Sequence, residues 1–269
     1  MEFAKMHGAG NDFIMINDMD ESLHISSDLV SVLCARHFGI GADGIVILRP
    51  SETGDFTMIY YNSDGSRAGM CGNGARSAVR FAVNEGIASG NISFQSDAGA
   101  MRGRIRGDKV EISMGEVRGL RLNMEIAGER VSYAVAGVPH AAIFEEGRTS
   151  SLQNNFVEAA REIRYSEHFK PAGANVSLVY DINEGSLSYR TYERGVEAET
   201  MACGTGALAI SVIAGHLGIT GQPVECRTAG GDILEVRYSK KPYGASDCFL
   251  TGPAVEIFRG TVDIPAFLE

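Results

Sequence analysis

The sequence predicts a mixed α+β protein with two related halves, each containing a buried helix among short strands. The pattern Cys-Gly-x-Gly-Ala occurs at residues 71–75 and again at 203–207, 132 positions apart in a chain of 269 residues. A spacing close to half the chain favours two structurally equivalent halves. Most of the remaining sequence consists of short apolar segments broken by Gly, Asn and Asp, which is typical of strands. Regular alternation of strand and helix is not evident.

A helical pattern follows each of the two cysteines. After Cys71, small apolar residues recur at helical spacing, and Gly86 can end the helix. After Cys203, the segment Ala207–Ala214 is apolar nearly all round, so we expect a helix that is buried on every side. Each cysteine should therefore lie at or just before a helix N-terminus. Two amphipathic helices are also expected, at Ser27–His37 and Gln153–Arg164.

Eight further segments have the residue pattern of strands. They are Gly44–Leu48, Phe56–Tyr61, Ile92–Gln95, Lys109–Met114, Asn175–Tyr180, Leu187–Tyr192, Ile233–Tyr238 and Cys248–Leu250. We expect a boundary between the halves near residues 115–119. The N-terminal half would comprise residues 1–115, with 256–269 returning to it, and the C-terminal half residues 116–255.

Composition excludes several classes of function. The hydrophobic content of 44% and charged content of 22% are typical of globular proteins. A net charge of -10, without a run of Lys and Arg, argues against nucleic-acid binding. No apolar segment approaches the roughly 18 residues of a membrane span, and the first residues do not resemble a signal peptide. Five cysteines do not suit a closed disulfide framework, so a reducing cytoplasm is expected.

The two cysteines at helix starts can carry chemistry. A helix N-terminus presents unpaired N–H groups and a partial positive charge, which lowers the pKa of a thiol from its usual value of about 8.5. The same N–H groups can bind a carboxylate. Two such helices could hold one carboxylate while Cys71 and Cys203 face the adjacent carbon from opposite sides. That arrangement suits inversion of a stereocentre by proton removal on one face and proton return on the other.

Other interpretations of the cysteines remain open at this point. Free cysteines often behave as small buried hydrophobic residues, which is the expected role of Cys34, Cys226 and Cys248 and an alternative for Cys71 and Cys203. A redox dithiol is disfavoured because the Cys-x-x-Cys spacing is absent. A metal site is disfavoured because no Cys or His residues have the spacing of ligands.

Three other features invite a functional interpretation. Residues 39–44 contain Gly-x-Gly-x-x-Gly, but here the glycines follow a helical segment and precede a strand, which is the reverse of a dinucleotide-binding fingerprint. Glu193 and Arg194 come at the end of a strand shortly before Cys203, and could bind an ammonium and a carboxylate group or form a surface pair. His140 follows Pro139 and could be structural or catalytic.

The sequence resembles the diaminopimelate epimerase family in blocks along the whole chain. The two cysteine blocks together carry most of the specificity. The matching blocks are His7–Phe13, Gly39–Gly44, Asn62–Ser66, Met70–Arg76, Tyr192–Glu197 and Thr200–Ala207.

This resemblance implies two pseudo-symmetric halves, each a β-barrel-like sheet around a central helix, with an active site in the cleft between them that closes over the substrate. It implies a homodimeric isomerase that interconverts LL- and meso-diaminopimelate, a small-molecule amino-acid substrate, in lysine and peptidoglycan precursor biosynthesis, without pyridoxal phosphate, metal or other cofactor. Cys71 and Cys203 would be the two bases, and His140 and Glu193 would lie near the reacting centre. The substrate would be held by Asn11, Asn62, Gly72, Asn73, Asn175, Glu193, Arg194, Gly204 and Thr205, the glycines, Asn73 and Thr205 acting through backbone N–H groups.

One position departs from the family pattern. Many members have Gly-Asn-Pro-His, in which the Asn contacts the far end of the substrate, whereas this chain has Gly137-Val138-Pro139-His140. Valine offers no side-chain hydrogen bond, so a racemase of another amino acid, such as histidine, is an alternative on the same fold. Arg194 and Asn62 favour a dicarboxylate. A non-catalytic amino-acid-binding or thiol-redox protein is the alternative from another class.

Overall fold

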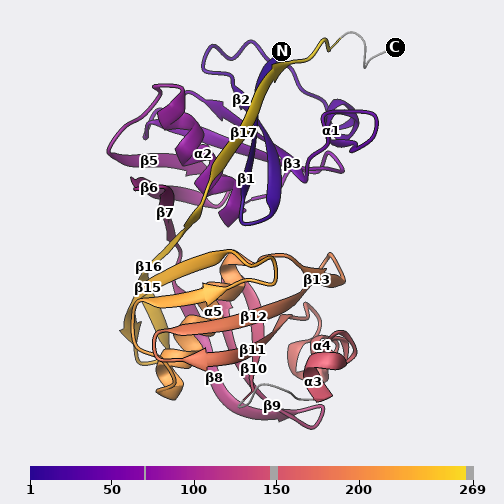
Figure 1. The fold of residues 1–269 in the computed structure, drawn as a ribbon, viewed down its shortest axis with the longest axis vertical. Coiled ribbons are helices and arrows are strands. Elements are labelled where there is room, and N and C mark those ends of the chain that lie inside the picture. The colour runs from indigo at the N-terminus through magenta and orange to yellow at the C-terminus, as the bar shows by residue number, and fades with distance from the viewer. Residues whose placement is uncertain (70, 146–150, 265–269) are drawn as a thin grey trace. The chain divides into compact units, whose positions relative to one another are not determined.

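The chain divides into two compact units (Figure 1). Unit 1 comprises Met1–Ile112 and Gly252–Glu269, and unit 2 comprises Ser113–Thr251. This computed structural model describes residues 1–69, 71–145 and 151–264. Met70, which belongs to one of the matching blocks, and the last five residues of the expected returning segment therefore lie outside the described residues.

In the described part of unit 1, two helices lie among the strands. Its elements in chain order are β1 (Glu2–Gly8), β2 (Asn11–Asn17), α1 (Ser27–Cys34), β3 (Gly44–Arg49), β4 (Phe56–Asn62), α2 (Gly72–Asn84), β5 (Asn91–Ser96), β6 (Gly99–Arg106), β7 (Lys109–Met114, which ends in unit 2) and β17 (Val255–Thr261).

Unit 2 also consists of strands with a few helices among them. Its elements are β8 (Val117–Ile126), β9 (Glu129–Ala136), β10 (Val138–Phe144), α3 (Ser151–Asn154), α4 (Phe156–Arg164), a 3₁₀ turn (Glu167–Phe169), β11 (Asn175–Asn183), β12 (Ser186–Glu193), β13 (Ala198–Thr200), α5 (Gly204–Leu217), β14 (Val224–Arg227), β15 (Ile233–Lys241) and β16 (Gly244–Pro253, which ends in unit 1).

The two units repeat one topology. In unit 1, β2 and β3 are parallel and flank α1, and β3 pairs antiparallel with β4 before the cysteine helix α2. In unit 2, β10 and β11 are parallel and flank α3 and α4, and β11 pairs antiparallel with β12 before α5. The strands after each cysteine helix correspond as well: β4 is parallel to β5, as β12 is to β14. The protein therefore has the mixed α+β fold of two pseudo-symmetric halves that was expected.

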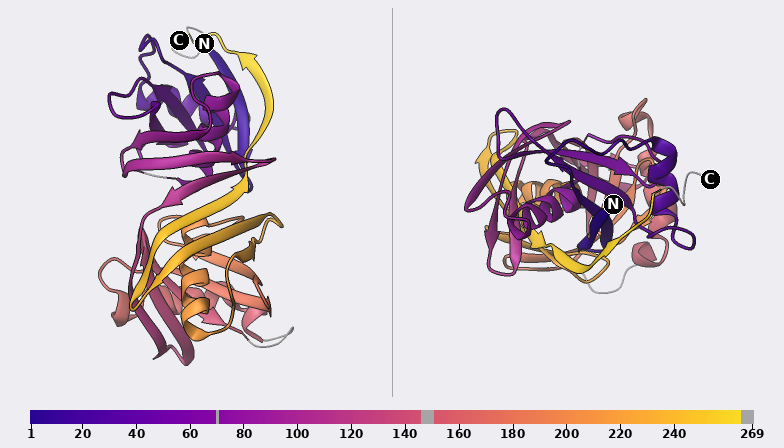
Figure 2. Two further views of the ribbon diagram at one scale, coloured as in Figure 1. Left: turned by 90° about the vertical axis from the view of Figure 1, so that its left-hand side faces the viewer. Right: turned by 90° about the horizontal axis from the view of Figure 1, so that it is seen from above.

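A central helix fills the core of each unit. Helix α2 contacts β1, β2, β3, β4, β6 and β17, and α5 contacts β8, β9, β10, β11, β14 and β15. The views of Figure 2 show strands on several sides of α2 (purple) and of α5 (orange). In α5, every residue from Gly206 to Ala214 is buried, which confirms the prediction drawn from its apolar sequence. Gly218 ends α5 in the left-handed region, with φ of 74°, where glycine is favoured.

Two of the predicted helices differ from those in the structure. Helix α1 ends at Cys34 instead of His37, because Ala35 adopts an extended conformation and its N–H bonds to the carbonyl of Val32. The predicted helix Gln153–Arg164 is broken into α3 and α4 at Asn155, which has φ of -113° and ψ of 22°. Asparagine competes for backbone hydrogen bonds through its side chain and is a poor residue for a helix interior.

Cys34, Cys226 and Cys248 are buried, as predicted. Burial raises the pKa of their thiols to about 11, 12 and 11, respectively. Gly39 and Gly41 lie between α1 and β3, and Gly44 is the first residue of β3, which confirms the reversed order noted in the sequence. None of the helices described is long and apolar enough to cross a membrane.

The buried helix of unit 2 makes a direct prediction about stability. Ile213 on α5 is fully buried, whereas Val157 on α4 is 40% exposed. Ile213→Ala should lower the free energy of unfolding by about 2–5 kcal/mol, because it removes buried apolar atoms and leaves a cavity. Val157→Ala should change it by less than about 0.5 kcal/mol. Urea unfolding followed by circular dichroism would measure both, and equal effects would contradict the burial of α5.

Candidate active site

Cys71 is the N-cap residue of α2, as predicted. Its backbone is extended, with φ of -135° and ψ of 117°, and its sulfur accepts a hydrogen bond of 3.4 Å from the N–H of Gly74. The thiol is only partly buried. N–H groups in the first turn of a helix have no partner within the helix, so Gly72 and Asn73 bring donors to the side of this sulfur.

A chain of polar side chains supports the start of α2. The amide of Asn11 donates to Asp43 at 2.9 Å, and its oxygen accepts from the Asn73 amide at 2.6 Å. The Asn73 oxygen accepts in turn from the buried guanidinium of Arg76 at 2.7 Å, and Arg76 also donates to the Pro253 carbonyl. The side chains of Asn11 and Asn73 are therefore tied into the structure of unit 1.

Asn62 occupies a turn at the end of β4. Its N–H and its side-chain amide donate to the carbonyl and the hydroxyl of Ser66, at 2.9 Å and 3.0 Å. On the neighbouring strand, Gly44 pairs with both Asn62 and Phe13, which places the end of β4 level with the start of β2. Asn62 thus lies on the same side of unit 1 as Asn11.

Cys203 is the N-cap residue of α5, also as predicted. It is buried, with 6% of its surface exposed, and the Tyr189 hydroxyl donates to its carbonyl at 2.9 Å. Gly206 packs directly beneath the thiol, because a Cβ atom at this position would lie 3.1 Å from the sulfur. The second glycine of the Cys-Gly-x-Gly pattern therefore leaves room for the sulfur.

The expectation of a lowered pKa was wrong for Cys203. Burial raises the pKa of its thiol well above the ordinary value, and the nearby Glu193 carboxylate adds to the rise. The Thr205 hydroxyl and the Gly206 N–H act in the opposite direction but do not offset the burial. In the described structure Cys203 is therefore a neutral thiol. Removing a thiolate from water destabilises it by more free energy than the helix N-terminus contributes in stabilisation.

His140 is joined to Cys203 through Thr205. Its Nε2 lies 3.1 Å from the Thr205 hydroxyl, which lies 3.6 Å from the sulfur of Cys203. The imidazole is fully buried, and its Nδ1 has no hydrogen-bond partner among the described residues. Burial, with the positive charge of Arg194, lowers the pKa of His140 to about 3. The imidazole is therefore neutral near pH 7.

Glu193 ends β12, as predicted, and Arg194 follows it. The Thr200 hydroxyl donates to Glu193 at 2.8 Å, and the backbone N–H of Arg194 donates to the side chain of Asn175 at 2.8 Å. His140 and Asn175 are paired across β10 and β11. Unit 2 thus gathers His140, Glu193 and Thr205 around one cysteine, with Asn175 beside His140 and bonded to Arg194.

The structure adds residues that the sequence analysis missed. Asp43 and Arg76 hold Asn11 and Asn73, and Tyr189 holds the backbone of Cys203. Asp43 and Arg76 could have been identified from the sequence, because both fall within the blocks that match the family. Nothing in the sequence distinguished Tyr189 from other strand residues. Groups of three or more acidic, Cys or His side chains able to hold a metal ion do not occur in the described part of the chain.

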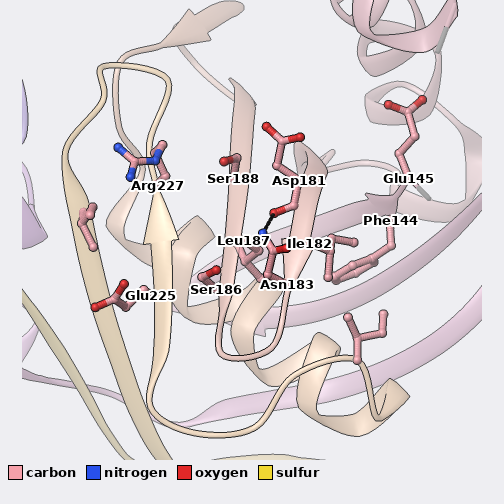
Figure 3. A pocket seen from close by; sticks show the side chains of 12 residues that line it. Phe144, Glu145, Asp181, Ile182, Asn183, Ser186, Leu187, Ser188, Glu225 and Arg227 are labelled. Atoms are coloured by element: carbon pink, nitrogen blue, oxygen red, sulfur yellow. Dashed lines mark hydrogen bonds between the residues drawn. The ribbon is translucent and has the colours of Figure 1, made fainter. Parts of the chain in front are cut away.

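A separate hollow of about 930 Å³ lies in unit 2 beside the β11–β12 hairpin (Figure 3). Its lining includes Phe144, Glu145, Asp181 and Arg227. None of the sequence-derived site residues lines this hollow.

Comparisons with known proteins agree with the motifs. The model of the family described as diaminopimelate epimerase matches residues 3–120 and 132–255. A diaminopimelate epimerase of Aquifex aeolicus is 37% identical, covering 97% of this chain and 97% of its own, and one of Archaeoglobus fulgidus is 36% identical, covering 96% and 95%.

A similar fold is found in a solved structure of low sequence identity. A probable proline racemase from Agrobacterium radiobacter is 16% identical, with a TM-score of 0.68 over 97% of this chain and 92% of that one. At this identity the likeness concerns the fold alone. The family model, the close relatives and the paired cysteine helices give one conclusion: the chain belongs to the diaminopimelate epimerase family of isomerases.

Proposed function

We propose that the protein interconverts LL- and meso-diaminopimelate, with Cys71 and Cys203 as the two acid–base groups. The observation that carries this proposal is the presence of an N-cap cysteine at corresponding helices of two units with the same topology. Curated relatives at 36–37% identity, which are named diaminopimelate epimerase, support the choice of substrate.

In the proposed reaction, one substrate contacts both cysteine helices. The carboxylate at the reacting centre binds the first-turn N–H groups of Gly72, Asn73, Gly204 and Thr205, since helix N-termini favour anions. One cysteine thiolate takes the Cα proton, and the electron pair left on Cα is delocalised into the bound carboxylate. The other thiol gives its proton to the opposite face of Cα and becomes a thiolate. One proton has left and one has arrived, with inverted configuration.

The environment of Cys203 indicates its starting role. Burial and Glu193 raise the pKa of this thiol, so it begins protonated and acts first as the acid. Cys71, which is partly exposed and accepts the N–H of Gly74, then acts first as the base. One turnover leaves Cys71 as the thiol and Cys203 as the thiolate, which is the protonation that a substrate of the opposite configuration needs.

The remaining polar residues are assigned to substrate binding. Glu193 and Arg194 would bind the ammonium and a carboxylate, and Asn11, Asn62 and Asn175 would hold further polar groups. His140 would act near the reacting centre through its contact with Thr205. Because two thiols supply both proton transfers, the proposed reaction requires no cofactor. It would take place in the cytoplasm.

A homodimer is part of the proposal. Strand β17 runs along β1 and exposes three large apolar side chains, with exposed fractions of 44% at Val255, 54% at Ile257 and 48% at Phe258. Apolar side chains grouped on one strand are typical of a surface covered by a partner.

The direct test is exchange of the Cα proton. In D₂O, the protein should incorporate deuterium into diaminopimelate with inversion, and should leave a panel of other free amino acids unlabelled. The panel matters because Val138 stands where many members have Asn. Exchange with histidine or another monocarboxylate alone would favour the alternative racemase, and absence of exchange with every amino acid would favour a binding protein.

Replacing either catalytic cysteine should disable epimerisation in both directions. A serine hydroxyl is too weak a base near neutral pH, so Cys71→Ser and Cys203→Ser should each lower kcat by about 10²–10⁴-fold or more. Each variant should still eliminate the halide from one stereoisomer of a halogenated substrate analogue, since elimination needs proton removal only. Cys34→Ser, which alters a buried cysteine outside the proposed site, should keep kcat within a few-fold. Near-normal epimerisation by either catalytic variant would refute the mechanism.

The buried His140 predicts a loss of stability in acid. Its pKa is about 3 in the folded protein, against about 6.5 when unfolded, so below pH 6.5 the unfolded chain binds a proton that the folded chain does not. Its contribution to stability is complete above pH 6.5 and declines as the pH falls towards 3. His140→Gln should therefore show a flatter decline of the urea midpoint between pH 6.5 and 4 than the wild type. If the urea midpoints of His140→Gln and the wild type declined with pH at the same rate, a neutral, buried His140 would be contradicted.

A further inference from the structure

The turn that carries Glu193 and Arg194 is held closed by a residue outside the proposed reaction. Residues 193–197 connect β12 to β13, and the N–H of Glu197 donates to the carbonyl of Glu193 at 2.8 Å. Glu197 adopts a left-handed conformation with φ of 58°, which is uncommon for a residue other than glycine. A glutamate in this conformation requires compensating contacts.

The carboxylate of Glu197 receives hydrogen bonds from four other residues. The N–H of Gly195, within the turn, donates at 2.9 Å, and Nε of Arg164 donates at 2.8 Å. A second nitrogen of Arg164 donates to the other carboxylate oxygen, so the ion pair is bidentate. The hydroxyls of Tyr165 and Tyr192 donate at 2.8 Å and 3.3 Å. These contacts hold the pKa of Glu197 at about 2, with the hydrogen bond from Arg164 as the largest cause.

Arg164 is itself enclosed by unit 2. It ends α4, and its side chain is 9% exposed. Gly173 packs against the guanidinium, because a Cβ at that position would lie 2.5 Å from Nη1. Two residues further along, Asn175 accepts the backbone N–H of Arg194. The segment that covers Arg164 is therefore also bonded to the turn, through Asn175.

We propose that Glu197 and Arg164 are positioning residues that fix the turn bearing Glu193 and Arg194 in its substrate-binding conformation. This inference rests on the proposed function, since it assumes that Glu193 and Arg194 bind substrate. Glu197 does not contact substrate itself: its oxygens are occupied by Arg164, Tyr165, Tyr192 and Gly195. It acts by holding Glu193 and Arg194 in place.

The test compares full-length Glu197→Gln, Arg164→Gln and the double variant with a matched control. The control is Glu256→Gln in unit 1, where Glu256 also pairs with an arginine, Arg259, at 2.7 Å. Each of the three turn variants should raise KM for diaminopimelate by about tenfold, consistent with the loss of hydrogen bonds between charged groups, and should change kcat less. Glu197→Asp, which keeps the charge, should raise KM by less than Glu197→Gln does. The control should leave KM within about twofold.

Two further results separate the possible failures. The double variant should be no worse in KM than either single variant, because both remove one interaction. Hydrogen exchange of the Gly195 and Glu197 amides should accelerate in Glu197→Gln and not in the control. A wild type without epimerase activity would refute the proposed function, while the exchange data would still test the positioning. Unchanged KM and unchanged amide exchange in Glu197→Gln, or multiplicative effects of the two single variants, would overturn the inference.

Discussion

The unpaired N–H groups at a helix start are the constraint on which the proposed site depends. The first turn of α2 and of α5 each leaves backbone donors without partners inside the helix. Both helices begin directly after a cysteine, and the glycines of the pattern keep side chains away from these donors. Because each helix is the core of its unit, the strands around it hold the donors rigidly. In the proposed reaction a carboxylate therefore binds these donors without reorganisation of the backbone.

Burial and the helix N-terminus have opposite effects on the pKa of the Cys203 thiol. The helix end favours a thiolate, but the enclosing strands and the carboxylate of Glu193 favour the thiol, and the second effect is larger. The contrast with Cys71 is informative, because that thiol is only partly buried. Two cysteines with the same sequence context are therefore set in different surroundings by their units. The proposed two-base reaction needs one thiol that begins protonated, and the surroundings of Cys203 favour that state.

Local sequence predicted the parts of the fold that depend on local interactions. The apolar run at Ala207–Ala214 was sufficient to predict a buried helix, and the repeated cysteine pattern was sufficient to place both N-caps. The hairpin of β8 and β9 was not predicted, because exposed polar residues such as Arg118 interrupt its apolar pattern. The high pKa of Cys203 and the ion pair between Glu197 and Arg164 also could not be predicted from the sequence. The first depends on how deeply the folded unit buries the thiol, and the second joins residues 33 positions apart.

The pairing of β17 with β1 has a consequence for how the protein folds. These strands pair from Glu2 with Thr261 to His7 with Val255, with one register shift between Lys5 and Met6, so closing unit 1 requires contact between residues nearly the whole chain apart. All of unit 2 is synthesised between them, and its own segment is continuous. Contacts of such long sequence separation form slowly, and domains tend to fold as they emerge during synthesis. Unit 2 can thus fold first. Until β17 has been synthesised, the edge of β1 that pairs with it has unpaired backbone groups, which can bind a strand of another chain.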